Sequence, residues 1–347
     1  MLSIIVLGYN HADISRRCLQ ALAASDIPFT FEVIFVDNGS TDQTPGLASE
    51  FERCFAQFRY LKYDENLVCS HAFNVAAACA TGELLLFLNN DVFVREHSVA
   101  NIVDALKRNK TAGIAGAKLV YPDEKTIQHA GMAPMLWGHT INYGAGGVED
   151  DPRFNVEKEM FAVTGAMLLI RHYLFKKVAG FEEGYVWGAE DIDLCLKVRR
   201  TGSSILYVPL AESIHEESMT LRNEKQPVPI QDNFRLYRKR WDAILRPLEK
   251  AYLDRMKELG IRKIIIFGTG SAAKALFEIL TNSGFIIEQF VESTSPQDPG
   301  ATFLGYRLTG PEALAHAEYD RAFVATQFYF SLEKQLPSSA IFPVLQV

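Results

Sequence analysis

A carboxylate that closes an apolar run is the first feature of this sequence that could do chemistry. Residues 84–88 are all apolar, and Asn89, Asn90 and Asp91 follow them directly. The run predicts a buried strand, and ligands of open α/β sheets bind beyond the carboxyl ends of the strands. A carboxylate placed there beside two amides suits a hard divalent cation shared with a substrate diphosphate. The same three residues are also typical of a turn, which is the alternative interpretation.

A second acidic cluster lies downstream, where Glu190, Asp191 and Asp193 stand at the start of a helical pattern. One carboxylate that binds a metal and another that is free to act as a base would make a group-transfer enzyme. Acidic side chains are also favoured in the first turn of a helix, because they interact with the helix dipole. Each cluster alone fits a structural role, so the functional interpretation depends on their occurring together.

Strand-like and helix-like segments alternate from the first residues onward. This alternation predicts an α/β fold with a parallel sheet and helices on its faces. Gly39 permits a turn with positive φ after the second strand, and Ser40 or Thr41 can cap the helix that follows. The expected strands are residues 3–7, 31–36, 58–63 and 84–88, and the expected helices are residues 14–24 and 66–80.

The pattern weakens between residues 113 and 147. A strand over residues 114–120 leads into a glycine-rich stretch at 138–147, which is either a mobile loop over a site or a surface excursion. Beyond it we expect a strand over 161–170, a helix over 191–200 and a strand over 205–208 that Pro209 stops. Residues 222–257 are charged and are predicted to be a largely helical connection.

Size and charge narrow the class of protein. The chain has 347 residues, enough for two domains, and its net charge of −7 argues against a nucleic-acid binder. No apolar run reaches the ~20 residues of a membrane span, so we expect no transmembrane segment. The first residues lack the basic segment of a signal peptide and predict a strand instead. Five scattered cysteines without a CxxC pair are typical of a reduced, cytoplasmic protein.

Several motifs along the first 245 residues resemble those of the family-2 glycosyltransferases of the GT-A fold, especially the rhamnosyltransferase-like branch. In chain order they are Val6-Leu7-Gly8-Tyr9-Asn10, Val36-Asp37-Asn38-Gly39-Ser40-Thr41-Asp42, Thr81-Gly82-Glu83 with Leu88-Asn89-Asn90-Asp91, Gln128-His129-Ala130-Gly131, Val163-Thr164-Gly165-Ala166 and Glu190-Asp191-Ile192-Asp193-Leu194. The resemblance implies a GT-A type open, mostly parallel sheet flanked by helices. It also implies direct displacement with inversion at the sugar, without a covalent enzyme intermediate.

The resemblance assigns roles to the residues that match these motifs. Asp37 would accept a hydrogen bond from the nucleotide base, and a carboxylate suits the imide N–H of uracil or thymine. Asp91, in the last place of the DxD motif, would ligate Mg²⁺ or Mn²⁺. Asp191 would be the catalytic base, with Glu190 orienting the acceptor or that base. The other expected contacts to the nucleotide sugar come from Gly8, Asn10, Asn66, Asn89, Asn90, Gly165 and Ala166.

Two further residues have a role only through the resemblance. His215 stands where relatives often place a metal-ligating histidine, and this role is balanced against that of an ordinary polar surface residue. Trp187 resembles the aromatic residue that many glycosyltransferases place against the acceptor sugar, and its alternative is a core or interface position. We assign His215 to the metal site and Trp187 to the acceptor site.

Three departures from the family pattern bear on these roles. Asn89-Asn90-Asp91 offers only one carboxylate at the DxD position. Val68 stands where glycines are usual, and its Cβ limits close approach of the backbone to the nucleotide. The run Gly180-Phe181-Glu182-Glu183 has Glu where relatives usually have Asp, which is a mild change.

Residues 258–347 predict a second, small Rossmann-like domain. Residues 264–273 have the order strand, Gly-x-Gly-x-x-Ala, helix, which is the form of a nucleotide-binding fingerprint. Gly268, Gly270 and Glu292 are the candidates for this second nucleotide site. The domain resembles the N-terminal domain of sugar O-acyltransferases. We rank a structural or assembly role ahead of NAD(P) binding, because one half-Rossmann unit rarely holds a whole dinucleotide.

These inferences predict a GT-A catalytic domain over residues 1–250 and a Rossmann-like domain over residues 258–347. The enzyme would move a sugar from a UDP- or dTDP-sugar to a hydroxyl of a glycan or lipid-linked saccharide in surface polysaccharide synthesis. It would work in the cytoplasm. Peripheral membrane contact through a lipid-linked acceptor is an open alternative, and so is assembly into a homo-oligomer. The rivals are a sugar-nucleotide oxidoreductase or bifunctional enzyme that uses the second domain, and a non-catalytic glycan-binding scaffold.

Overall fold

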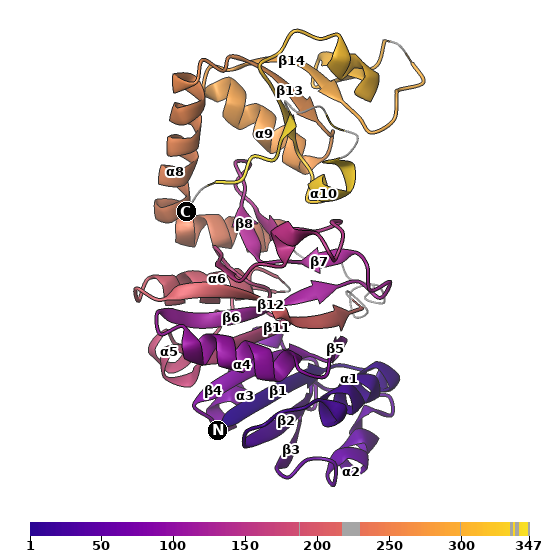
Figure 1. Cartoon of the computed structure of the whole chain (residues 1–347), viewed down its shortest axis with the longest axis vertical. Coiled ribbons are helices and arrows are strands. Elements are labelled where there is room, and N and C mark those ends of the chain that lie inside the picture. The colour runs from indigo at the N-terminus through magenta and orange to yellow at the C-terminus, as the bar shows by residue number, and fades with distance from the viewer. Residues whose placement is uncertain (187, 217–229, 299, 334–335, 337–339, 346–347) are drawn as a thin grey trace. The chain divides into compact units, whose positions relative to one another are not determined.

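The chain divides into two compact units in the computed structural model, which describes residues 1–186, 188–216, 230–298, 300–333, 336 and 340–345. The first unit holds Met1–Met132 and Val148–Tyr237, and the second holds Ala133–Gly147 and Arg238–Val347. A segment from the middle of the chain therefore belongs to the unit that is otherwise formed by the C-terminal residues. Figure 1 follows the chain by colour from the first residue to the last.

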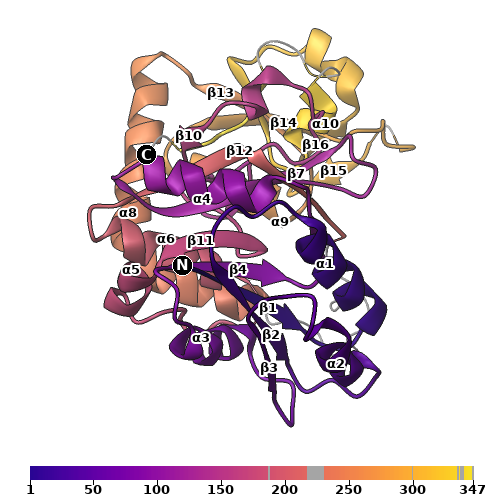
Figure 2. The same cartoon turned by 60° about the horizontal axis from the view of Figure 1, so that its bottom comes forward.

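One large sheet organises the first unit (Figures 1 and 2). Its strands are β1 (Leu2–Gly8), β2 (Phe31–Asp37), β3 (Phe58–Lys62), β4 (Leu84–Asn89), β5 (Val92–Val94), β6 (Ala112–Val120), β7 (Ile127–His129), β10 (Lys158–Glu159), β11 (Met167–Arg171) and β12 (Ser204–His215). β12, β6, β4, β1, β2 and β3 run in one direction, while β11 lies antiparallel between β4 and β6. The expected open, mostly parallel α/β sheet is confirmed.

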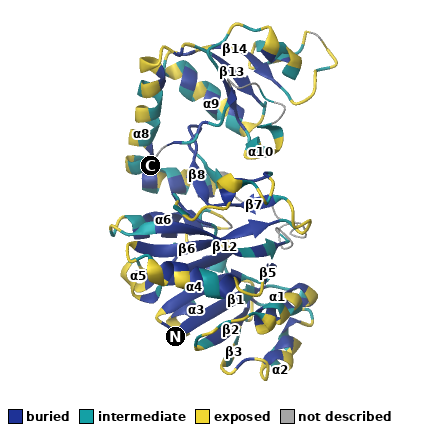
Figure 3. Cartoon of the chain, viewed as in Figure 1, coloured by how far each residue is buried: buried dark blue, intermediate teal, exposed yellow. Residues whose placement is uncertain are grey.

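Helices cover both faces of this sheet, which explains why its central strands are apolar throughout. The helices of the unit are α1 (Ala12–Ala24), α2 (Leu47–Phe51), α3 (Cys69–Cys79), α4 (Ser98–Arg108), α5 (His172–Lys177) and α6 (Glu190–Arg199). Leu86 and Leu88 of β4 join the cluster formed by α1, α2 and α4. Phe87 points to the other face, where its ring centroid lies 5.0 Å from that of Phe73 in α3. Figure 3 shows the buried sheet between the partly exposed helices.

Parallel pairing brings the ends of three strands to one edge of the sheet. Gly8 pairs with Asp37 across β1 and β2, and Leu7 pairs with Asn89 across β1 and β4. The turn after β2 requires a glycine, because Gly39 has a φ of +82° and a Cβ there would lie 2.3 Å from the carbonyl carbon of Glu65. Residues that follow β1, β2 and β4 are therefore available to a common site.

Three elements differ from the sequence-based expectation. β12 does not stop at Pro209, because the register with β6 shifts between Val208 and Ser213 and such a bulge tolerates a residue without an N–H. The strand expected over residues 161–170 is confined to β11, since the backbone turns at Gly165 to bond Asp191. α3 begins at Cys69 rather than at residue 66, because side-chain bonds hold the preceding loop.

The glycine-rich segment is neither a loop over a site nor a surface excursion. It forms a two-stranded sheet from β8 (Met132–Pro134) and β9 (Thr140–Asn142). Leu136 and Trp137 are buried in the core of the second unit. The N–H of Leu136 donates to the carbonyl of Pro343 at 2.9 Å, and the N–H of Leu345 donates to the carbonyl of Pro134 at 2.8 Å. The segment is therefore structural, and the expectation of a loop was wrong.

The second unit has a sheet of its own with the order β15-β16-β14-β13-β17-β18. Its elements are α8 (Ile230–Glu258), which enters the unit at Arg238, β13 (Lys263–Phe267), α9 (Ser271–Asn282), β14 (Ile286–Val291), β15 (Thr302–Phe303), β16 (Tyr306–Thr309), β17 (Arg321–Val324), α10 (Tyr329–Leu332) and β18 (Ala340–Ile341). β13, α9 and β14 form a parallel strand–helix–strand unit. Of the helices that the structure describes, none has the length and apolarity to cross a membrane.

Candidate active site

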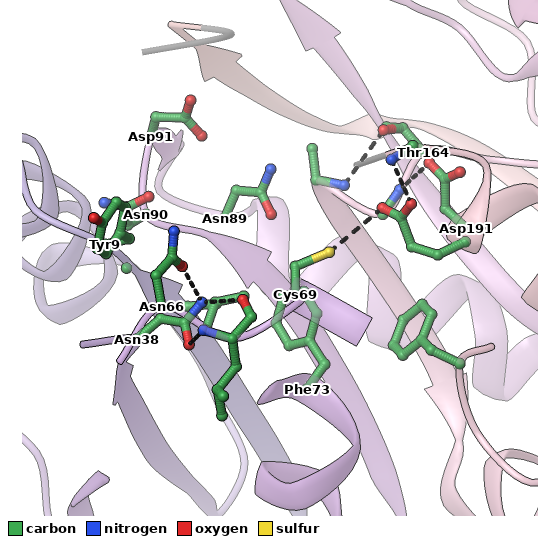
Figure 4. A pocket seen from close by; sticks show the side chains of 18 of the residues that line it. Tyr9, Asn38, Asn66, Cys69, Phe73, Asn89, Asn90, Asp91, Thr164 and Asp191 are labelled. Atoms are coloured by element: carbon green, nitrogen blue, oxygen red, sulfur yellow. Dashed lines mark hydrogen bonds between the residues drawn. The ribbon is translucent and has the colours of Figure 1, made fainter. Parts of the chain in front are cut away.

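The sheet edge at which β1 and β4 end is hollowed into a cavity of about 360 Å³. Figure 4 shows Asp91 and the amides of Asn66 and Asn90 on one side of it and Asp191 with Thr164 on the other. The cavity brings together most of the residues that the sequence singled out, namely Gly8, Asn66, Asn89, Asn90, Asp91, Gly165, Ala166, Glu190, Asp191 and His215.

Asp91 and His215 form one end of the cavity. Asp91 follows β4 and His215 is the last residue of β12, and the two strands converge through β5, where Val92 pairs with His215. The Asp91 Oδ1 and His215 Nε2 atoms are 3.2 Å apart, and their side chains are 12% and 11% exposed. Mg²⁺ holds octahedral ligands at about 2.0–2.1 Å, so neighbouring ligands lie about 3 Å apart. The spacing therefore fits two ligands of one divalent cation.

This pair alone would not enclose a metal ion. Among the residues that the structure describes, no group of three or more His, Cys, Asp or Glu side chains is arranged to hold one. Hard cations such as Mg²⁺ commonly take one or two carboxylates and complete their coordination with substrate phosphates and water. The donor set fits a cation that the protein shares with a bound diphosphate.

Asp191 lies at the opposite end of the cavity, in the first turn of α6. Its Oδ2 accepts the N–H of Gly165 at 2.8 Å and its Oδ1 accepts the N–H of Ile192 at 2.8 Å. Gly165 allows this approach because a Cβ there would lie 3.3 Å from the Cβ of Asp191. Burial raises the pKa of the Asp191 carboxyl, and the two N–H donors oppose that rise by favouring the ionised form.

Glu190 is the more strongly perturbed member of the acidic pair. Burial, followed by the charge of Asp191, raises its pKa to about 7. Its Oε2 accepts the N–H of Gly188 at 2.8 Å, and its Oε1 lies 3.8 Å from the thiol sulfur of Cys69. Burial also raises the pKa of the Cys69 thiol, so that this donor stays protonated. The pair thus has one carboxylate whose ionised form is favoured by two backbone donors and one whose pKa burial raises to about 7.

The backbone before α6 adopts unusual conformations that place this pair. Ala189 precedes the helix with a φ of +74°, and Gly188 has a φ of +102°. A left-handed conformation in a residue other than glycine is unfavourable and is often retained at functional sites. Here it turns the chain so that Glu190 and Asp191 both face the cavity.

Two predicted nucleotide-binding residues lie outside the cavity lining. Asp37 is fully buried, where its carboxylate accepts the N–H of Ser40 at 2.8 Å and the hydroxyl of Tyr60 at 2.6 Å. The side chain of Asn10 accepts the N–H of Thr41 at 2.9 Å. In the structure both side chains stabilise the turn after β2. Trp187, the predicted acceptor-binding residue, lies outside the described residues.

Asn38 and Gln128 line or support the site without having been assigned a role from the sequence. The Asn38 amide donates to the Asn66 side chain at 2.9 Å and to the Leu67 carbonyl at 2.8 Å, which holds the loop before α3. Gln128 contacts the ring of His215 at 2.5 Å. Both residues fall inside motifs that could be recognised in the sequence, but only the folded chain shows what their amides contact.

The candidate residues of the second unit meet at the carboxyl edge of its sheet. Gly268 follows β13 with a φ of +108°, and its N–H donates to the Val291 carbonyl at 2.7 Å. Gly270 precedes α9. Glu292 accepts a hydrogen bond from the Thr269 hydroxyl, so the carboxylate expected to bind a ribose has a partner within the chain.

Comparison with known proteins now adds to this geometry. Residues 3–179 match the sequence model of Glycosyl transferase family 2. The chain belongs to this family. Residues 260–341 match a separate model, described as C2185-like, N-terminal. The resemblance noted from the sequence motifs is confirmed for the first unit.

The family 2 relatives differ greatly in length. The O-antigen biosynthesis protein RfbC of Myxococcus xanthus is 30% identical over 237 residues, which cover 65% of this chain and only 18% of that protein. The N-acetylglucosaminyl-diphospho-decaprenol L-rhamnosyltransferase of Mycobacterium tuberculosis is 28% identical, with 63% of this chain and 76% of that enzyme aligned. This family 2 chain thus spans less than a fifth of RfbC.

A solved structure supports the fold of this family 2 chain. The crystal structure of GalNAc-T7 with UDP, GalNAc and Mn²⁺ has a TM-score of 0.58 at 13% identity, covering 83% of this chain and 55% of that one. At this identity the likeness concerns the fold alone. The GT-A type fold expected from the sequence is confirmed.

Proposed function

We propose that this chain is a metal-dependent, inverting glycosyltransferase. It transfers a sugar from a UDP- or dTDP-sugar to a hydroxyl of a glycan or lipid-linked saccharide. The observation that carries the proposal is that Asp191 lines the same cavity as the Asp91–His215 pair. A base and a candidate cation site in one cavity are what sugar transfer from a nucleotide diphosphate requires.

Asp191 acts as the base in this proposal. Its carboxylate accepts the proton of the acceptor hydroxyl while the hydroxyl oxygen bonds to the anomeric carbon. The bond between that carbon and the diphosphate oxygen breaks, and the diphosphate leaves with the electron pair. The N–H groups of Gly165 and Ile192 fix Asp191 and favour its ionised form for this step. Attack from the face opposite the leaving group inverts the configuration.

Asp91 and His215 would hold the divalent cation, and Mg²⁺ and Mn²⁺ both suit their donor atoms. When bound, the cation neutralises the diphosphate and makes it a better leaving group. Asn66, Asn89 and Asn90 line the cavity nearby and can bond to the donor's polar groups without adding charge. Asp37 remains our candidate for the nucleotide base, and binding there would exchange its contact with Tyr60.

The acceptor class rests on the relatives. Their names refer to O-antigen biosynthesis and to a rhamnosyltransferase that acts on a diphospho-decaprenol carrier. We therefore propose a surface saccharide or its lipid-linked precursor as the acceptor, with catalysis in the cytoplasm and any membrane contact made through that lipid. For residues 258–347 we propose an assembly role ahead of NAD(P) binding, since Glu292 already has a partner within the chain.

A thermal-shift panel of UDP-, dTDP-, GDP- and CDP-sugars, each with Mn²⁺ or with EDTA, tests the proposal. We expect stabilisation by one pyrimidine nucleotide donor that disappears in EDTA. Including NAD(P) tests the oxidoreductase alternative. A shift with NAD(P) alone, and none with any donor, would contradict the glycosyltransferase proposal.

A further inference from the structure

The side chain of Gln128 contacts both the ring and the backbone of His215. Gln128 lies in the middle of β7 and is 2% exposed, and His215 is 9% exposed. The Gln128 Oε1 atom lies 2.5 Å from His215 Nδ1. Its Nε2 atom lies 3.5 Å from the backbone carbonyl oxygen of the same histidine. A buried side chain thus contacts both the ring and the main chain of one residue.

The backbone contact determines which way the amide faces. A carbonyl oxygen can only accept a hydrogen bond, so the NH₂ group of Gln128 must be on its side. The amide oxygen then faces the ring, and an oxygen acceptor requires a proton on His215 Nδ1. With Nδ1 as the donor, Nε2 is the ring nitrogen left to bind a cation, and it is the atom 3.2 Å from Asp91 Oδ1.

We propose that Gln128 is a positioning residue for the cation site. It keeps the proton of His215 on Nδ1, so that Nε2 is the nitrogen that can bind a cation shared with Asp91. Histidines that bind metals generally donate their second ring N–H to such a partner, which fixes the ring and its tautomer. The inference rests on the proposed metal-dependent transfer, and because the Asp91 carboxylate accepts a proton on Nε2 when no cation is bound, the tautomer is measured with a cation present.

β7 is well placed for this role because it is paired through the sheet. His129 pairs with Leu119 of β6, and Ile127 pairs with Val120. β12, which ends at His215, also pairs with β6, where Ile214 is opposite Val120. Gln128 and His215 are therefore attached to the same strand, and their relative position follows from sheet register rather than from a flexible loop.

Two variants separate positioning from packing. Gln128→Met keeps the volume and removes the acceptor, while Gln128→Glu keeps an acceptor for the Nδ1 proton. Gln289→Met is the matched control, since Gln289 is a buried glutamine of β14, 7% exposed, in the second unit. Thermal unfolding of each variant reports on packing.

The first readout is the ¹⁵N NMR spectrum of the protein labelled at histidine, recorded with Mg²⁺ and UDP and assigned with His215→Asn. We expect the Nδ1–H tautomer at His215 in the wild type, Gln128→Glu and Gln289→Met, and a mixture of tautomers in Gln128→Met. The second readout is the affinity for Mn²⁺ in the presence of UDP, followed by electron paramagnetic resonance. We expect Gln128→Met to bind about 10–100-fold more weakly and Gln128→Glu to be close to wild type.

An unchanged tautomer and unchanged Mn²⁺ affinity in a folded Gln128→Met would overturn the inference. Loss of Mn²⁺ binding in Gln128→Glu as severe as in Gln128→Met would also overturn it, because the retained acceptor would then be irrelevant. A wild type that binds no Mn²⁺ with UDP would refute the proposed function instead. In that case the Nδ1 proton, which should be protected from exchange without metal in the wild type and lose that protection in Gln128→Met, still decides whether Gln128 holds the ring.

Discussion

The neighbouring carboxylates Glu190 and Asp191, in the first turn of α6, have different surroundings. Asp191 is held by two backbone N–H donors, which favour its charged form. Glu190 is buried against that charge and has a pKa of about 7. Environments that move two pKa values apart are typical of sites in which the groups have separate roles. This difference supports the proposal, made from the family resemblance, that Asp191 is the base.

Replacing Asp191 by Asn should remove the base and leave the donor site intact. We expect turnover to fall by about 10²–10⁴-fold, the usual contribution of general base catalysis. The Kd for the donor in Mn²⁺ should change little, because Asp91 lies at the other end of the cavity (Figure 4) and His215 adjoins Asp91. Asp13→Asn in α1, whose side chain is 94% exposed, is the control. Normal turnover in Asp191→Asn would remove it as the base.

Asp91→Ala should make donor binding independent of metal. We expect its Kd for the donor in Mn²⁺ to rise toward the wild-type value in EDTA, because His215 alone offers a single ligand. Calorimetric titration of UDP with Mn²⁺ and with EDTA measures this difference. Asp104→Ala, at an exposed position of α4, should retain the wild-type difference. If Asp91→Ala still distinguishes Mn²⁺ from EDTA, the cation is held elsewhere.

The raised pKa of Glu190 predicts a pH dependence of stability. Its value rises from 4.5 to about 7 in the folded protein, so the folded state keeps a proton that the unfolded chain loses. The free energy of unfolding should therefore fall as pH rises through this range. Glu190→Gln removes that titration, so its Tm relative to wild type should increase from pH 5 to pH 7 and then level off. A difference that stays constant with pH would contradict the raised pKa.

At the scale of elements, the sequence predicted best what depends on apolar runs and parallel pairing. β4 and the position of Asp91 follow from five apolar residues, and the start of α6 follows from its acidic first turn. The sequence predicted least well the features that depend on contacts between residues far apart in the chain. β12 passes Pro209 because of a bulge against β6, and the polar contacts of Asp37 with Tyr60 involve residues 23 positions apart.

β6 and β12 also enclose a buried cation whose removal should weaken the fold. Lys118 is 1% exposed and lies 2.9 Å from Glu212 and 3.1 Å from Glu149. Lys118→Met should destabilise the protein by about 3 kcal/mol, the low end for breaking a buried pair, because Arg95 still pairs with Glu212. Urea denaturation measures the change, with the exposed Lys125→Met as control. A change below about 1 kcal/mol would mean that the charge is effectively solvated.

At the scale of the whole molecule, the two units are not successive segments of chain. Residues 133–147 belong to the second unit, where Trp137 and Leu136 are buried. No composition or periodicity marked this insertion in the sequence, since the glycines that suggested a loop instead permit the turn between β8 and β9, at Gly138, and the turns after β9, at Gly144 and Gly146.

Removing the second unit at residue 237 should therefore expose apolar side chains of the inserted segment. We expect the truncated chain to bind a hydrophobic dye and to aggregate, because Met135, Leu136 and Trp137 would lose their partners. A second truncation, with residues 133–147 replaced by a Gly-Ser linker, should bind less dye and remain monomeric in gel filtration. Equal dye binding by both truncations would contradict this account.

The insertion also delays the folding of residues 133–147 during synthesis of the chain. Residues 134–136 bond to residues 343–345, so about 200 further residues must leave the ribosome before these partners are available. At about 5–20 residues per second, this takes about 10–40 s. During that interval the nascent chain carries an unpaired Trp137 while residues 148–237 of the first unit are themselves still emerging, and chaperones would be expected to bind there.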